Sequence, residues 1–505
     1  MLAAIRSAAL VGIDAYDVMV EVDAAPGLPQ WTLVGLPLGA VKESRERVGA
    51  AIVNSGFTLP PRRITVNLAP ADVRKEGTAF DLPIALGILV ATGQLDPHLI
   101  GCRIYAGELG LDGQIRPVRG ALSIARHAAS AGVREIVIPS SNVAEASRVS
   151  ALTISAPAML RELIDQLCNG GLREAGIPAV ADVRHSGSLD FGDVIGQDSA
   201  KRALEVAAAG GHNLLMIGPP GAGKTMLARR LAGILPELTE EEALEVIAIH
   251  SVAGLLTPES ILSCARPFRA PHHSISSAGL IGGGSSPRPG EVSLAHNGVL
   301  FLDEMLEFPR FVLDGLRQPM EDGRVVISRV ASSVRFPARF TLIGATNPCP
   351  CGRLGDPTGA CTCSPLDVER YGSRMSGPLA DRIDMHVTVG AVAIRDLSSP
   401  VKSEPSSRIR ERVAFARRVQ LTRFRSLAGV SCNAHASGRA IDTSGTVTPE
   451  ARSLLQTAAN SLALSARGYH RVLKVARTIA DLDQSPKVGR DHVSEAIRYR
   501  PVRNA

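Results

Sequence analysis

The sequence predicts an α/β protein built from several domains, and three observations carry this prediction. Strand-like segments alternate with helical patterns over residues 1–168 and again over residues 189–395. An apolar strand at 214–217 runs into a glycine-rich loop and then a helix, whereas residues 396–505 show helical patterns alone. Residues 169–188 are rich in Gly, Pro and Ala without periodicity, and we predict a linker there between the first domain and the second.

Composition places the chain among folded proteins. Hydrophobic residues make up 45% and charged residues 21% of its 505 positions, and at about 150 residues per domain this length gives about three domains. The longest apolar stretch, 82–91, contains Pro83 and Gly87 and is shorter than the ~18 residues of a membrane span, so we expect a buried helix there. Because Asp14 and Asp17 come too early for a signal peptide, we expect a cytoplasmic protein with no membrane partner.

Charge is distributed unevenly along the chain. The formal net charge is +6, but residues 401–505 carry 19 Lys and Arg against 8 Asp and Glu, and the remainder carries 36 against 41. A basic segment suits a polyanion such as nucleic acid, and a solvated helical face explains it equally well. Aromatic residues are only 3% of the chain, so stacking platforms for single-stranded bases would be few.

The first domain combines strands and helices. Alternating or β-branched segments predict strands at 17–22, 63–68, 104–109 and 135–139, and helical patterns lie at 40–54, 81–92 and 121–130. Asp112-Gly113 predicts a hairpin with a two-residue turn, because such turns need positive φ. In the last domain Thr448-Pro449 predicts the start of a helix.

The strongest motif is the loop between the strand at 214–217 and the following helix. Its pattern fits a phosphate-binding loop, in which glycines let the backbone approach phosphate oxygens. Lys224 would meet the β- and γ-phosphates, and the hydroxyl of Thr225 would bind Mg²⁺. The residues of this loop are Gly218, Pro219, Pro220, Gly221, Ala222, Gly223, Lys224 and Thr225.

Four polar groups downstream complete a hydrolytic site. The apolar strand 298–302 ends in Asp303, which can hold Mg²⁺, and Glu304, which can deprotonate water. The strand 340–345 leads to Asn347, whose amide can position that water. Arg382 is the type of residue that ring ATPases supply from a neighbouring subunit to neutralise the γ-phosphate.

A family resemblance follows from these motifs. The order GPPGAGKT, VLFLDE, GATN, SGPLADRID and SARGYHRVLKVARTIADL resembles the magnesium-chelatase-like AAA+ ATPases of the ComM (YifB) family over essentially the whole chain. The resemblance implies a P-loop AAA+ core with a helical lid, ATP and Mg²⁺ as cofactors, and a homo-hexameric ring. It also implies that Asn347 is sensor 1, that Arg382, with Arg374 as competitor, is the arginine finger, and that Arg467 rather than Arg471 is sensor 2.

The same resemblance implies an inserted segment around RPFRAPHHSISSAGLIGGGSSPRPG and a β-hairpin at 325–336 before sensor 1. Independently of the family, VVISRVASSVRF reads as two short strands around a turn at 331–333. Arg329 and Arg335 on these strands would reach DNA phosphates. A plain surface hairpin is the alternative interpretation.

Four cysteines fall in one loop, as Cys349-Pro350-Cys351 and Cys361-Thr362-Cys363. Four thiolates suit zinc, but the CxC spacing departs from the commoner CxxC, so reduced structural cysteines are the alternative. The adjacent His272 and His273 are interpreted as polar scaffolding and not as metal ligands.

The first domain also resembles the proteolytic domain of Lon-type proteases, on RKEGTAFDLPIALGILVATG, GELGLDGQIRPVRGALSIARHAASAG and REIVIPSSN. Lon-type proteases use a Ser-Lys pair, and the alignment puts Ala79 at the serine position and Leu122 at the lysine position. Neither side chain can do that chemistry. The resemblance therefore implies a catalytically inactive, degenerate α+β domain that serves as a scaffold or docks a substrate.

The phosphate-loop motifs predict an ATP-hydrolysing protein. The family resemblance implies that it is a ring motor acting on single-stranded or branched DNA, a helicase or branch-migration translocase in recombination or DNA uptake. The first alternative is a chelatase-type ATPase that couples hydrolysis to metal insertion or protein remodelling. The second is a proteolytic ATPase, against which Ala79 and Leu122 argue.

Overall fold

The computed structural model describes residues 2–176, 189–284, 287–329, 332–355, 359–391, 403–427, 429–442 and 446–501. The chain forms two compact units, each made of three stretches. The first unit contains 1–183, 243–263 and 328–336, and the second contains 184–242, 264–327 and 337–505. Most of the predicted linker and the predicted boundary at 395/396 lie outside the described residues.

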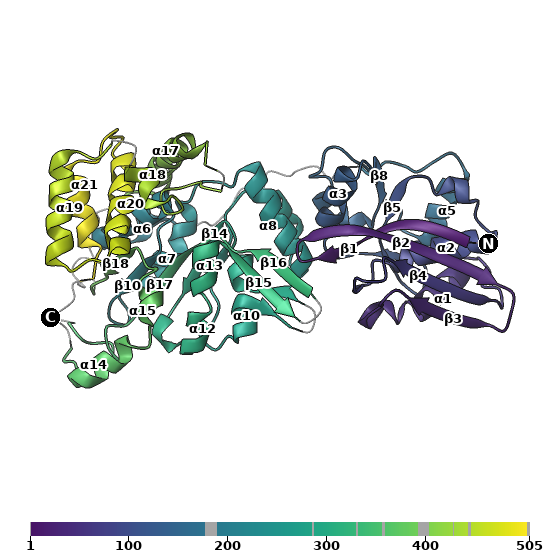
Figure 1. Cartoon of the computed structure of the whole chain (residues 1–505), viewed down its shortest axis with the longest axis horizontal. Coiled ribbons are helices and arrows are strands. Elements are labelled where there is room, and N and C mark those ends of the chain that lie inside the picture. Colours follow the sequence, from purple (N-terminus) through teal and green to yellow (C-terminus); the bar gives the residue numbers. More distant parts are fainter. Residues whose placement is uncertain are drawn as a thin grey trace. The chain divides into compact units, whose positions relative to one another are not determined.

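The first unit has a four-stranded sheet in the order β1-β2-β4-β3 (Figure 1). It also has a parallel three-stranded sheet β5-β8-β9 and the hairpin β6-β7. Its strands are β1 (Leu2–Val11), β2 (Asp14–Ala25), β3 (Gln30–Val34), β4 (Arg63–Ala69), β5 (Arg103–Tyr105), β6 (Glu108–Leu109), β7 (Ile115–Arg116), β8 (Glu135–Val137) and β9 (Thr153–Ser155). Its helices include α1 (Ser44–Asn54), α2 (Asp81–Ala91), α3 (Ala121–Ser130), α4 (Val143–Ala146) and α5 (Leu160–Cys168).

Helix α2 lies at the centre of this unit, and every one of its residues is buried. A helix that is apolar on all sides belongs in a core, which confirms the prediction for the stretch 82–91. Gly87 allows α2 to pack closely on β2, because a Cβ at this position would lie 2.5 Å from Cγ2 of Val22.

Two local predictions in this unit are corrected. The strand predicted at 104–109 is divided into β5 and β6, because the backbone turns away at Gly107, whose N–H donates to the carbonyl of Ala79 at 3.0 Å. The hairpin at Asp112-Gly113 exists, but its loop has three residues, since Gly110 N–H pairs with the carbonyl of Gln114. Gly113, with φ of +86°, takes the left-handed position of that loop.

Residues 243–263 of the first unit cover part of its surface. They include most of α8 (Glu240–Ala253) and α9 (Pro258–Leu262). Leu122 on α3 is fully buried and packs against Ile247 and Ala248 of α8. Beside it, the hydroxyl of Ser251 donates to the buried carboxylate of Glu145.

The second unit is built on a five-stranded parallel sheet in the order β11-β14-β17-β10-β18. The strands are β10 (Leu214–Ile217), β11 (Phe268–Arg269), β14 (Gly298–Leu302), β17 (Phe340–Thr346) and β18 (Met385–Thr388). The helices between and after these strands are α6 (Asp198–Gly210), α7 (Lys224–Arg230), α10 (Ser277–Ile281), α11 (Glu291–Leu294), α12 (Arg310–Asp314), α13 (Arg317–Asp322), α14 (Pro365–Gly372) and α15 (Gly377–Ala380). Parallel strands present their carboxyl ends at one edge, where α/β proteins place their ligands.

Helices follow this sheet, as the periodicity of 396–505 predicts. They are α17 (Ser406–Phe424), α18 (Gly438–Asp442), α19 (Pro449–Ser461), α20 (Ala466–Leu482) and α21 (Arg490–Arg498). The hydroxyl of Thr448 caps α19 by accepting from the N–H of Ala451, so the predicted helix start is confirmed. Among the described residues, no helix is both long and apolar enough to cross a bilayer.

Candidate active site

The glycine-rich loop forms a tight connection between β10 and α7. Gly221 and Gly223 have φ of +80° and +86°, which side chains with a Cβ rarely adopt. Gly218 lies so close to the end of β18 that a Cβ would come within 2.1 Å of the carbonyl oxygen of Val389. A Cβ on Gly221, by contrast, would have no neighbouring atom within 4 Å, so the backbone faces open space there. The loop thus has the backbone conformation and the open face that let phosphate-binding loops contact phosphate oxygens.

Lys224 is the first residue of α7, and its ammonium group lies inside this loop. Nζ donates to the carbonyls of Gly218 at 2.7 Å and Pro219 at 2.9 Å, and to Oδ1 of Asn347 at 3.1 Å. Burial lowers the pKa of Lys224, an effect that the carboxylates of Asp303 and Glu304 partly oppose. The predicted sensor residue at the end of β17 therefore contacts the predicted phosphate-binding lysine directly.

Thr225 and Asp303 lie together at the ends of α7 and β14. The hydroxyl of Thr225 donates to Oδ2 of Asp303 at 2.6 Å. A hydroxyl and a carboxylate side by side at the mouth of a phosphate loop are the oxygen ligands that Mg²⁺ takes in nucleotide sites.

Glu304 follows Asp303 in a left-handed conformation with φ of +48°. Its carboxylate is half exposed, and Oε2 lies 3.4 Å from Nδ1 of His273. The rings of His272 and His273 are 4.0 Å apart. Our interpretation of both histidines as scaffolding missed this contact, because it arises from the pairing of β11, which precedes the histidines, with β14, which precedes Glu304.

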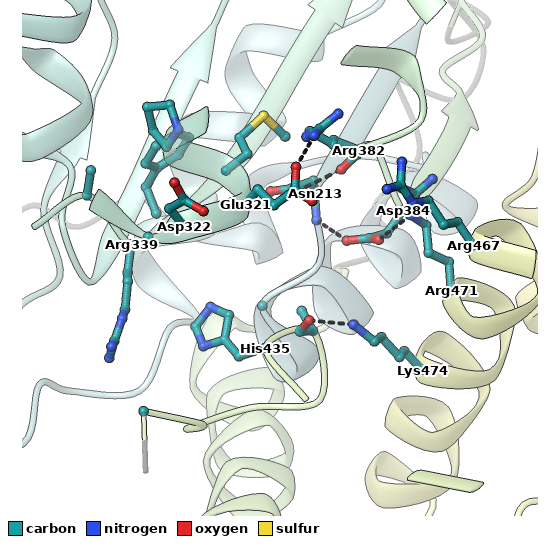
Figure 2. A pocket seen from close by; sticks show the side chains of 18 residues that line it. Asn213, Glu321, Asp322, Arg339, Arg382, Asp384, His435, Arg467, Arg471 and Lys474 are labelled. Carbon is teal, nitrogen blue, oxygen red and sulfur yellow. Dashed lines mark hydrogen bonds and ion pairs between the residues drawn. The ribbon is translucent and has the colours of Figure 1, made fainter. Parts of the chain in front are cut away.

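The predicted arginines lie elsewhere in the second unit. Arg382 and Arg467 line a cavity of about 420 Å³ with Arg471 and Lys474 of α20, and no residue of the phosphate loop lines it (Figure 2). Its basic lining residues are Arg339, Arg382, Arg467, Arg471 and Lys474, and its acidic ones are Glu321, Asp322 and Asp384. It therefore carries an excess of positive charge.

Each of these arginines has a different environment. Arg382 is paired with Glu321, and its Nη1 donates to the carbonyl of Pro378 at 2.8 Å. Arg471 lies 3.5 Å from Asp384, whereas Arg467 is exposed. Arg374, the competitor for the finger, instead contacts Glu307 at 2.8 Å, three residues beyond Glu304.

The hairpin before sensor 1 consists of β15 (Arg324–Arg329) and β16 (Ser332–Pro337). Arg335 is exposed between the buried Val334 and Phe336, so its side chain points away from the core. The side chain of Arg329 and part of the predicted turn at 331–333 lie outside the described residues. The four cysteines of the CxC pairs are brought together, with all four sulfurs within 4.8 Å of one another.

Comparison with known proteins matches nearly the whole chain to one family. Residues 190–397 match the family described as magnesium chelatase, subunit ChlI; residues 20–142 match subunit ChlI of Mg-chelatase, and residues 403–500 match its C-terminal part. The chain is 45% identical to competence protein ComM of Haemophilus influenzae, with 99% of this chain and 98% of that protein covered. The chain belongs to the ComM/YifB family of magnesium-chelatase-like ATPases.

Other relatives agree with this assignment. The uncharacterized protein YifB of Escherichia coli is 43% identical, with 99% of this chain and 97% of that protein covered. The magnesium-chelatase 38 kDa subunit of Rhodobacter capsulatus is 28% identical, over 34% of this chain and 53% of that subunit. The predicted resemblance and the AAA+ type of ATPase core are thus confirmed.

Membership of this family implies ATP and Mg²⁺, and the residues at the carboxyl edge of the sheet fit both. The glycine loop would hold the phosphates, with Lys224 offsetting their charge, and Thr225 and Asp303 would hold the metal ion. Bound there, Mg·ATP supplies the phosphoryl group to be cleaved. Glu304 would take the proton of the attacking water, and Asn347 would orient that water.

Proposed function

We propose that this ATPase works as a homo-hexameric ring motor on single-stranded or branched DNA, as a helicase or branch-migration translocase. The observation that carries this proposal is that Arg382 and Arg467 line a cavity to which no residue of their own phosphate loop contributes. An arginine that neutralises the γ-phosphate must reach it. In the described structure these two arginines line a cationic cavity together and not the loop of their own chain, which supports their serving the nucleotide of a neighbouring subunit.

Mixing two inactive variants tests this arrangement. Arg382→Ala alone should lower ATP turnover by about a thousandfold, the usual contribution of an arginine finger, and Glu304→Gln alone should stop turnover while ATP still binds. In mixed rings, some interfaces combine an intact Glu304 from one subunit with an intact Arg382 from the next. Mixing should therefore restore part of the activity. If Arg382 served its own chain's nucleotide, the mixture would stay inactive.

DNA as the substrate is supported by Arg335 on the exposed side of β16 and by the basic C-terminal segment. The name of the Haemophilus relative, a competence protein, agrees with a role in DNA uptake. ATP turnover should rise when DNA is added. Single-stranded, duplex and four-way substrates, compared in mobility-shift assays with and without ATP, identify the preferred form.

We further propose that the first unit is a Lon-like scaffold without peptidase activity. The position that aligns with the catalytic lysine is Leu122, which lies buried under α8 and so reaches no substrate. The position of the serine is Ala79, which offers only a methyl group. ATP-dependent cleavage of casein by the purified chain would contradict this assignment.

A chelatase-type ATPase, which remodels a partner protein or drives metal insertion, remains the second candidate. It is favoured by the matches to magnesium chelatase subunit ChlI along the chain. The two functions differ in what stimulates turnover. A chelatase-type ATPase would respond to a protein partner and not to DNA.

A further inference from the structure

The segment between Asn347 and α14 brings four thiols into one cluster. The Sγ atoms of Cys349 and Cys351 are 3.4 Å apart, those of Cys349 and Cys361 are 3.7 Å apart, and those of Cys351 and Cys361 are 3.6 Å apart. Cys349 is fully buried, and all the cysteines are free thiols. These separations exceed a disulfide bond, which is about 2.05 Å long.

The spacing matches one metal ion at the centre of the cluster. Zinc binds thiolates at about 2.3 Å in a tetrahedron, which places neighbouring sulfurs about 3.8 Å apart. A cluster of several irons spreads its thiolates over separate metal atoms and needs wider spacing. Four sulfurs that all lie within 4.8 Å of one another therefore fit a single tetrahedral ion.

Two backbone N–H groups donate to sulfurs of the cluster. The N–H of Leu354 points at Sγ of Cys349, and the N–H of Cys351 points at Sγ of Cys363, each at 3.4 Å. Hydrogen bonds of this kind stabilise thiolate ligands and fix their direction. The turn that supplies the first two ligands is closed by Gly352 N–H donating to the carbonyl of Cys349 at 2.9 Å.

We propose that Cys349, Cys351, Cys361 and Cys363 bind one structural Zn²⁺, and that this zinc knuckle holds the phosphate loop and Asn347 in their working positions. The second half of the proposal rests on the ATPase function. Its structural basis is Gly352, which has φ of +78° and packs directly on the loop. A Cβ there would lie 2.6 Å from Cδ of Pro220 and 3.8 Å from Cγ of Asn347.

The zinc-bound turn thus supports two parts of the nucleotide site, the phosphate loop at Pro220 and the sensor residue Asn347. Asn347 precedes the first ligand by two residues, and α14 begins two residues after the last ligand with a capping box between Ser364 and Asp367. The segment that carries the four cysteines therefore lies between two regular elements, β17 and α14. Without the metal, Cys349 and Cys351 would lose their link to Cys361 and Cys363, because these thiols form no disulfide.

Metal analysis of the full-length protein, purified without chelator, tests the site itself. We expect about one zinc per chain, and after replacement by Co²⁺ the visible bands of a tetrahedral tetrathiolate centre. Cys361→Ser should lose most of the zinc, whereas Cys264→Ser, which changes an exposed thiol outside the cluster, should keep it. A folded unmutated protein that contains no zinc and takes up neither ion, or one that contains stoichiometric iron, overturns the zinc site.

A pair of glycine variants tests the contact with the phosphate loop. Gly352 and Gly355 both have φ near +75° to +78°, so alanine is strained at either position. Gly352 approaches Pro220, whereas around Gly355 no atom of the described residues lies within 4 Å of an added Cβ. Binding of a fluorescent ATP analogue should weaken about tenfold or more in Gly352→Ala relative to Gly355→Ala. Equal affinities would overturn the contact's role, whatever the zinc content.

The metal analysis and the comparison of the glycine variants test different claims, so a negative result in one does not decide the other. Zinc content is measured without nucleotide, so it stands even if the chain's motor activity is disproved. ATP affinity reports on the support of the loop and not on DNA.

Discussion

His273 is the partner of Glu304, with Nδ1 of the imidazole 3.4 Å from Oε2 of the carboxylate. Glu304 is the predicted base for the attacking water, and a base paired with a neighbouring side chain is drawn away from other partners. His273 reaches this position from the segment after β11, the edge strand beside β14. His273 is therefore the side chain whose removal tests how this contact affects the predicted base.

We expect His273→Ala to raise basal ATP turnover about two- to fivefold, because a half-exposed pair of this kind contributes at most about 1 kcal/mol. ATP affinity should not change. His272→Ala is the matched control, since His272 bonds Ser274 and not Glu304. Steady-state hydrolysis at saturating ATP measures the effect. A fall in turnover would mean that His273 helps Glu304 to act as a base.

Lys224 and Glu304 should separate binding from turnover. Lys224→Ala removes a charged donor to phosphate and should weaken ATP binding about ten- to a hundredfold. Glu304→Gln keeps the shape of the side chain but not its basicity, and should lower turnover by about 10²-fold or more with ATP affinity intact. Nucleotide titration and phosphate release measure the two effects. Normal turnover in Glu304→Gln would remove the base assignment.

We expect Arg329 and Arg335 on the hairpin to bind DNA phosphates during the ATP cycle. Replacing both by alanine should abolish DNA-stimulated hydrolysis and strand displacement, while basal hydrolysis survives. The slope of log K against log[salt] for duplex binding should become less negative by about 0.9 for each phosphate contact that is lost. Arg418→Ala with Arg425→Ala, which removes two exposed charges at α17, is the control. If the hairpin variant unwinds DNA normally, the C-terminal arginines become the better candidates.

Introducing at position 122 the lysine that a Lon-type site requires should destabilise the protein. Because Leu122 is buried against Ile247 and Ala248, Leu122→Lys places an unpaired ammonium in an apolar cluster. We expect a loss of about 3 kcal/mol or more in stability of the first unit. Leu122→Met should cost less than about 1.5 kcal/mol, because it conserves volume. Thermal unfolding of the two variants should differ clearly, and equal curves would mean that α8 does not cover this position.

The sequence-based predictions were most accurate where the determinants are local. The strand 214–217, the helix start at Thr448 and the strands before Asp303 and Asn347 depend on patterns a few residues long, and each is confirmed. Strand β1 was missed, because its alanine-rich sequence has only two β-branched residues, Ile5 and Val11, and the strand is stabilised by its pairing with β2.

The site features that were missed depend on tertiary pairing. The contact between His273 and Glu304 requires the order of strands in the sheet, which no local pattern contains. Likewise, the apolar residues of α8 indicate a buried face but not that this face packs on α3 in the first unit. The position of Arg467 depends on where α20 lies in the second unit, so its sequence neighbourhood could not show that it shares a cavity with Arg382.

The five crossings of the chain between its two units have a practical consequence for dissecting the protein. The first unit takes two of its three stretches, 243–263 and 328–336, from within the ATPase region of the sequence. A gene fragment that stops at the linker would lack them and would expose Leu122 and Glu145, which residues 243–263 cover. Neither half is thus an autonomous folding module, and a single backbone break within 177–188 would leave both tied together by the remaining crossings.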